Sequence, residues 1–161
     1  MEKTIYIPGD LVMTNGVPLG TAQNVVYRVT SSDPSKTLEL DDGTVLKGVV
    51  CLENIEGAEF GEKGYLSGDC CAWVKDIVPI NLVPAILEKN GWEFIGYHMD
   101  NNGSLLNICS KRGILPHLYY YYATENFIVY ICGKVALPNM KYIHELQHLL
   151  FGLGINPEME V

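Results

Sequence analysis

The chain has few basic side chains and no long hydrophobic run. Among its 161 residues, 11 Lys and Arg stand against 19 Asp and Glu, which gives a net charge of −8. So few cations exclude broad binding to duplex nucleic acid or to an anionic membrane, because both need Lys and Arg against phosphate. The apolar stretch 127–132 is far shorter than the ~20 residues of a transmembrane helix. We therefore expect no duplex nucleic acid and no membrane as partners.

The marks of secretion and of a disulfide framework are also missing. No basic segment followed by an apolar one stands at the N-terminus, so we expect no signal peptide. The cysteines are odd in number and lack C-x-x-C spacing; they are Cys51, Cys70, Cys71, Cys109 and Cys132. We expect a cytoplasmic location in which most of these thiols are small core hydrophobes.

The common catalytic and cofactor motifs are absent as well. The chain has no Walker A sequence, no G-x-G-x-x-G segment after a strand and no G-x-S-x-G nucleophile elbow. With 48 % hydrophobic residues, it can build a core without a metal or a disulfide. We therefore expect a protein that uses no cofactor and is not an enzyme.

The first 76 residues are expected to form a small SH3-like β-barrel. Short β-rich segments are bounded by turn residues, at 10–14, 25–30, 38–40 and 45–50. The last two of these read as a hairpin, because an Asp-Gly dipeptide between them favours a tight turn. Residues 31–35 are predicted to be a loop. Residues 56–71 hold four glycines and four acids, which predicts a second, longer loop.

Residues 77–161 are expected to form an antiparallel sheet packed with two short helices. Asn81 is a good N-cap for a helix that ends near Gly91, and Asn139 and Gly154 bound a second helix. Between the helices, β-rich segments predict a meander, with strands near 92–97, 105–109, 119–122 and 127–132. The chain is thus predicted to be α+β, with its two parts forming one compact unit.

The second helix carries the sequence His-Glu-Leu-Gln-His at residues 144–148, a match to the H-E-x-x-H motif. On a helix this spacing puts both imidazoles on one face, as a zinc ion needs. A catalytic zinc also needs a third protein ligand, and Gly154 stands where the extended motif has a histidine. The apolar pattern of the helix places His144 and His148 on its flank or solvent side. We predict no metal site, and keep zinc at His144 and His148 as the alternative.

Three segments resemble a family of small proteins of Bacteroidetes phages and prophages. Members of that family carry a helix reading Tyr-Val-His-Gln-Leu-Gln-Asn-Leu-Tyr-Phe-Ala-Leu, which is similar to residues 141–153. They also share a Gly-Asp/Asn-Leu-Val segment and an Ile-Pro-Leu-Thr helix start, similar to residues 9–12 and 78–92. Because the family often has Gln and Asn in place of the Glu and the second His, the resemblance implies a structural helix. It brings no catalytic residues, and the 56–71 loop and the tyrosine-rich segment depart from it.

The resemblance implies a phage-encoded protein that acts by binding in the host cytoplasm. Small phage proteins of this kind often sequester a nucleotide-type signal of a bacterial immune system. A site for such a small anionic ligand needs aromatic platforms for bases and cations for phosphates. In the run 119–122, alternate tyrosines face opposite sides of a strand, so one pair can face a ligand. The candidate ligand-binding residues are Trp73, Lys111, Arg112, Tyr119 and Tyr121.

Two other functions stay open on the sequence. The first is a zinc-dependent hydrolase that uses His144, His148 and Glu145. The second is a protein–protein adaptor or inhibitor that binds a host protein through an acidic surface, since residues 37–76 hold nine acidic and three basic side chains. Homo-oligomer formation is a further open point, because small chains often build a ligand site at an interface.

Overall fold

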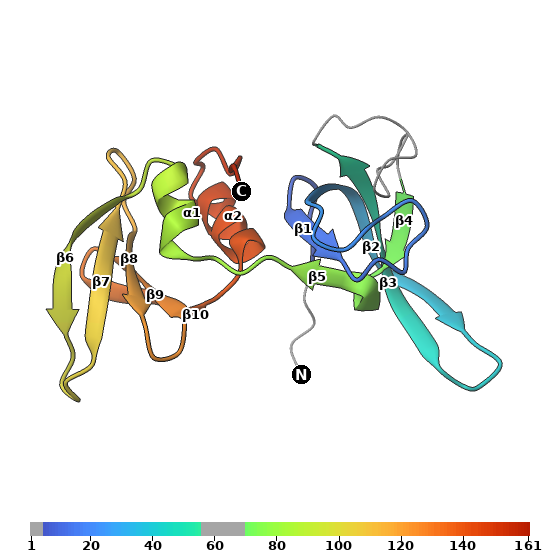
Figure 1. The fold of residues 1–161 in the computed structure, drawn as a ribbon, viewed down its shortest axis with the longest axis horizontal. Helices are drawn as coiled ribbons and strands as arrows, with labels where there is room; N and C mark the ends of the chain where they lie inside the picture. Colours follow the sequence, from blue (N-terminus) through green and yellow to red (C-terminus); the bar gives the residue numbers. More distant parts are fainter. Residues whose placement is uncertain (1–4, 56–69) are drawn as a thin grey trace. The chain divides into compact units, whose positions relative to one another are not determined.

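The computed structural model describes residues 5–55 and 70–161. The chain divides into two compact units, of which the first ends at Ile80 and the second begins at Asn81. This division lies a few residues beyond the sequence-based boundary at residues 76 and 77. The reason is the strand Ile77–Pro79 (β5), which pairs with the first strand of the chain. Each unit has an antiparallel sheet of its own (Figure 1).

Within its described residues, the first unit contains five strands in the order β4-β3-β2-β1-β5. They are β1 (Leu11–Thr14), β2 (Tyr27–Glu39), β3 (Val45–Asn54), β4 (Cys70–Trp73) and β5, with a 3-10 turn (η1, Val74–Asp76) before β5. β2 and β3 pair through Glu39 and Val45 at the predicted Asp-Gly turn. The core consists of apolar side chains from several strands, chiefly Val12, Tyr27, Val29, Val50, Leu52 and Ala72.

The first sheet is strongly irregular along β2. This strand takes in residues 31–35, so the prediction of a loop there was wrong. A register shift between Asp33 and Thr37 spans Pro34, which has no N–H to donate to the sheet, and another shift lies between Val29 and Ser31. In the described residues β4 pairs with β3 and β5 pairs with β1, which leaves the sheet unclosed.

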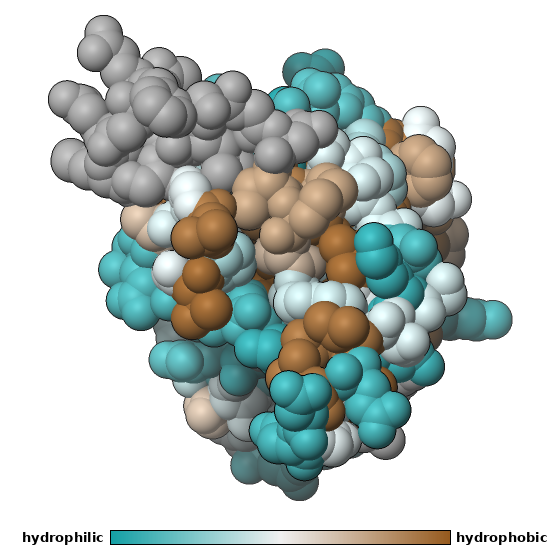
Figure 2. All heavy atoms as spheres, turned by 90° about the vertical axis from the view of Figure 1, so that its right-hand side faces the viewer, coloured by the Kyte–Doolittle hydropathy of each residue, from teal (hydrophilic) through white to brown (hydrophobic). Residues whose placement is uncertain are grey.

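Large apolar side chains are scattered over the surface of the first unit. Figure 2 shows hydrophobic patches separated by hydrophilic ones on the side that carries this unit. The most exposed apolar side chain is Leu19, at 91 %. Scattered exposure of this kind is ordinary on a globular protein. Most of the predicted acidic loop, residues 56–69, lies outside the described residues.

The second unit combines a five-stranded meander, in the order β10-β9-β8-β7-β6, with two helices. The strands are β6 (Glu93–Met99), β7 (Leu105–Ser110), β8 (His117–Tyr121), β9 (Asn126–Ile131) and β10 (Lys134–Met140). Helices α1 (Pro84–Lys89) and α2 (Ile143–Gly152) lie on one side of this sheet (Figure 1). The α+β class is as predicted, and β10 was missed. No helix in the described ranges is long and apolar enough to cross a membrane.

Both helices begin later than their capping signals predict. The N-cap residues are Val83 and Tyr142, rather than the predicted Asn81 and Asn139. Asn81 instead forms a β-bridge with Tyr142, and Asn139 lies in β10. The N–H of Leu82 adds a backbone hydrogen bond of 2.8 Å between the same two segments. Pairing between distant segments therefore overrides the local signal for a helix start.

Candidate functional site

The sheet of the second unit has one face toward the helices and one open face. Along β8, Leu118 and Tyr120 are buried, whereas Tyr119 and Tyr121 are half-buried. This is the alternation expected of a strand. Cross-strand register extends the second set over β6, β7 and β9. We define the open face by the following residues: His98, Ile108, His117, Tyr119, Tyr121, Ile128 and Tyr130.

Aromatic rings meet at the centre of the open face. The ring centroids of Tyr119 and Tyr130 are 4.3 Å apart, and the ring of His98 meets Tyr119 edge-on at 5.9 Å. The same row of the sheet includes Gly96, where nothing lies within 4 Å of the position of a Cβ. The missing side chain leaves the sheet surface next to the rings uncovered. The cluster is therefore a half-exposed platform on which a flat ring can stack.

One end of the open face holds a fixed carboxylate. The hydroxyl of Tyr121 donates to Asp100 Oδ2 at 3.1 Å, and the N–H groups of Asn102 and Ser104 donate to Asp100 Oδ1. The hydrogen bond from the backbone N–H of Ser104 is the largest cause of a lowered pKa of Asp100; burial opposes it, and the hydrogen bond from Tyr121 lowers the pKa further. Burial and the bond to Asp100 raise the pKa of Tyr121. At neutral pH this end therefore carries a negative charge, which disfavours a phosphate group.

The two predicted cations lie at the opposite end of β7 from Asp100, and the Cε of Lys111 comes within 3.5 Å of the position of a Cβ at Gly91, just after α1. Lys111 and Arg112 follow β7 at the turn into β8, whereas Asp100 precedes β7. Lys111 is half-buried and Arg112 is exposed. Within residues 5–55 and 70–161, neither forms a salt bridge. An anionic group on the open face is therefore favoured at the β7–β8 end.

Trp73, the remaining predicted contact, belongs to the first unit. It is half-buried at the end of β4, where it pairs with Val49. The structure thus brings Tyr119 and Tyr121 together on one face, and it places the two cations at the β7–β8 turn. Trp73 is not a member of that face.

Sequence reasoning missed three residues of this region: His98, Asp100 and Tyr130. Tyr130 carried a usable signal, since it follows Ile128 by two positions in a predicted strand and so shares its face. His98 carried none, because its contact with Tyr119 depends on the register of β6, β7 and β8. Cross-strand register of this kind is set by tertiary pairing.

The His-Glu-Leu-Gln-His segment lies on α2, where its side chains make structural contacts. His144 is 4 % exposed; its ring stacks on Tyr142 at 5.8 Å and meets His148 edge-on at 5.5 Å. Glu145 Oε1 accepts hydrogen bonds from the backbone N–H groups of Lys141 and Tyr142, at 3.2 and 3.1 Å. That carboxylate therefore caps the start of the helix. In the described part of the chain, no three His, Cys, Asp or Glu residues gather as a metal site.

The buried side of α2 is rotated from the predicted one. We expected both histidines on the flank or solvent side; His148 is half-buried, as a flank position is, but His144 is buried. Gln147 is also buried, and its Nε2 donates to the carbonyl oxygen of Pro157 at 3.2 Å. Residues after the helix therefore cover polar positions that an apolar pattern assigns to solvent.

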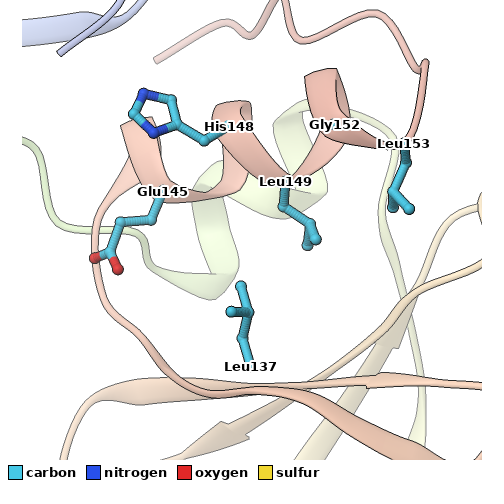
Figure 3. Close-up of a pocket in the computed structure, with 6 residues that line it drawn as sticks. All are labelled: Leu137, Glu145, His148, Leu149, Gly152 and Leu153. Atoms are coloured by element: carbon cyan, nitrogen blue, oxygen red, sulfur yellow. The ribbon is translucent and has the colours of Figure 1, made fainter. Parts of the chain in front are cut away.

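An open groove of about 450 Å³ runs between α2 and β10. Leu149 and Leu153 of the helix and Leu137 of the strand line its apolar part (Figure 3). At one end, the side chains of Glu145 and His148 point in different directions (Figure 3). The two groups of the zinc motif that border the groove therefore do not converge on a common point.

Glu145→Ala is expected to lower the free energy of unfolding by about 1 kcal/mol. The change removes the acceptor of two backbone N–H groups at the start of α2. Urea denaturation followed by circular dichroism measures the loss. Glu88→Ala, at an exposed position of α1, is the matched control and is expected to stay within about 0.5 kcal/mol of the wild type. Equal stabilities of the two variants would contradict the capping role.

The open face carries an aromatic cluster and an acidic end, and the two cations lie at the β7–β8 turn, at the other end of β7. This arrangement suits a ligand with a flat ring and a negative charge, held by stacking and charge pairing. The zinc-motif glutamate, by contrast, is occupied as a helix cap. The chain has no significant match to any protein-family model, curated protein or solved structure.

Proposed function

We propose that the protein is a non-enzymatic binding protein that captures a nucleotide-type ligand on the open face. The observation that carries this proposal is the half-exposed ring contact of Tyr119 with Tyr130, on the side of the sheet away from the helices. Stacking of one base on an aromatic side chain is worth about 1–3 kcal/mol. The two rings are tilted by 38° and pack on each other, so the proposed base stacks on the exposed side of the Tyr119 ring, which Tyr130 supports.

The charges near the two ends of the open face favour one orientation of the bound ligand. Asp100 repels phosphate at one end, and Lys111 and Arg112 attract it at the other. A guanidinium group can pair with two phosphate oxygens at once. A nucleotide is therefore proposed to lie with its base over Tyr119 and its phosphate toward the β7–β8 turn.

The resemblance to phage proteins extends this proposal to a biological role. A phage-encoded protein in the host cytoplasm would act as an anti-defence protein by sequestering a nucleotide signal of the host immune system. Sequestration requires affinity and no bond-breaking step, which agrees with a face built for stacking and charge pairing. It also needs no cofactor.

We infer in addition that the first unit is a small SH3-like barrel. Support comes from its antiparallel pairing, in which β5 returns to β1, and from the bulges that bend β2. Bulges increase the local twist of a sheet and help it curl. Barrels of this type are frequent interaction modules, so a host protein is the partner that we would expect for this unit.

Tyr119→Ala is expected to weaken nucleotide binding by about 5- to 150-fold, which corresponds to the loss of one stacked base. A panel of cyclic oligonucleotides and cyclic ADP-ribose isomers, screened by differential scanning fluorimetry, identifies the ligand. Isothermal titration calorimetry then gives the dissociation constants. Tyr119→Phe keeps the ring and is expected to bind within about twofold of the wild type.

Tyr122→Ala is the matched control for this experiment. Tyr122 is exposed and contacts the ring of the buried Tyr120 at 5.2 Å, so it lies apart from the open face. Its removal should leave the affinity for the nucleotide unchanged. Joint replacement of Lys111 and Arg112 by alanine should lower that affinity and make it less dependent on salt concentration. The proposal fails if no nucleotide in the panel stabilises the protein, or if the Tyr119 and Tyr122 variants lose affinity equally.

A further inference from the structure

Two cysteines face each other across neighbouring strands of the first unit. Cys51 of β3 and Cys71 of β4 are register partners, and their Sγ atoms lie 2.8 Å apart. Facing residues of antiparallel strands have Cα atoms about 4.5–5.5 Å apart, which falls within the ~4.4–6.8 Å that a disulfide spans. The backbone and the side chains therefore already hold the two sulfurs in position to bond.

The other thiols lie in different surroundings. Cys70 neighbours Cys71 in β4, but its Sγ donates to the carbonyl oxygen of Leu19 at 3.0 Å. Cys109 is buried and Cys132 is exposed in the second unit. The expectation that most thiols would be core hydrophobes was wrong, because only Cys109 is buried. Cys71 is exposed and Cys51 half-buried, so a small oxidant reaches the facing pair at Cys71.

We propose that Cys51 and Cys71 are a redox modification site, a dithiol that closes into a disulfide between β3 and β4. The oxidant is a low-molecular-weight disulfide of the glutathione class. The Cys71 thiolate attacks one sulfur of the oxidant, whose S–S bond breaks and releases a thiolate. The Cys51 thiolate then attacks Cys71 Sγ and releases the second. The two protein thiols lose two protons and two electrons, and the oxidant leaves as two thiols.

The surroundings of Cys71 set the pH dependence of this reaction. Its hydrogen bond with Cys51 and its partial burial raise the pKa of the Cys71 thiol, and the nearby Lys36 acts in the opposite direction. The thiolate is the attacking species. Closure is therefore expected to be slow at neutral pH and to accelerate as the pH rises toward the pKa of Cys71.

Closure is tested on the full native chain with oxidised glutathione in mildly alkaline buffer, followed by acid quenching and mass spectrometry. The five cysteines of the chain are expected to retain three free thiols, and the mass should fall by two hydrogen atoms. Peptide mapping should show a link between Cys51 and Cys71. Five remaining thiols, a stable glutathione adduct on Cys71, or a link through Cys70 or Cys132 would overturn the proposal.

Serine variants separate the roles of the thiols. Cys51→Ser should leave glutathione attached to Cys71, because no second thiol resolves the mixed disulfide, and Cys71→Ser should prevent closure. Cys70→Ser, at the next position of the same strand, is the matched control and should close like the wild type. If a variant does not fold, the peptide map of the wild type still decides. The outcome is independent of nucleotide binding, which is assigned to the other unit.

Discussion

Phe127→Ala is expected to lower the free energy of unfolding by about 3–5 kcal/mol. Phe127 is fully buried in β9, where it pairs with Tyr120 of β8 and with Met140 of β10. Its ring lies 4.8 Å from that of Tyr120. Removing the ring therefore opens a cavity between the sheet and the helices, in addition to losing buried apolar surface. A domain has only about 5–15 kcal/mol of stability, so urea denaturation should show a large shift in midpoint.

The next residue of the same strand provides the control for this experiment. Ile128 lies on the open face and is half-buried, so Ile128→Ala should cost less than about 2 kcal/mol. The two variants differ mainly in which face of β9 loses a side chain. Equal losses would contradict the assignment of an inner face and an open face, and with it the geometry on which the proposed ligand site depends.

The class of fold and the alternation within strands were predictable from the sequence. The meander, the two short helices and the β2–β3 hairpin follow from local patterns of apolar and turn residues. In the tyrosine run, a period of two is enough to separate Tyr120 from Tyr119 and Tyr121. These features depend on residues that are close in sequence, and local patterns report them well.

The helix starts and the buried side of α2 depend on segments distant in sequence. Asn81 is extended because it bridges to Tyr142. Gln147 is buried because a carbonyl group after the helix accepts its hydrogen bond. A helical wheel predicts the buried side of a helix from its apolar residues alone. It cannot show that a segment after the helix accepts a hydrogen bond from a polar side chain and so allows that side chain to be buried. The same apolar pattern placed His144 on the flank or solvent side, whereas its side chain is buried.

The candidate site was predictable only in part for the same reason. Tyr119 and Tyr121 carry a pattern within one strand, whereas His98 joins them through the register of three strands. Trp73 was grouped with them on residue type alone, and the structure places it in the other unit. The pair Cys51 and Cys71 likewise has no sequence signature, because a cross-strand partner has no fixed spacing.

Gly48→Ala is expected to lower the free energy of unfolding by about 2–5 kcal/mol, from two separate causes. Gly48 lies in β3 with a φ of +84°, a conformation that costs an L-residue about 1–2 kcal/mol. A Cβ at this position would also stand 2.9 Å from Cγ2 of Val74 in η1. Such overpacking adds about 1–3 kcal/mol. Urea denaturation of the purified variant measures the sum.

Two further variants separate the causes. Gly43 has a φ of +86° and nothing within 4 Å of a Cβ position, so Gly43→Ala should lose only the conformational part. Val74→Ala in the Gly48→Ala background removes the methyl group that a new Cβ would meet, and should recover about 1 kcal/mol or more of the overpacking cost. No recovery in this double variant would mean that η1 does not pack against β3 at Gly48. The close approach of η1 to β3 at Gly48 would then have to be abandoned.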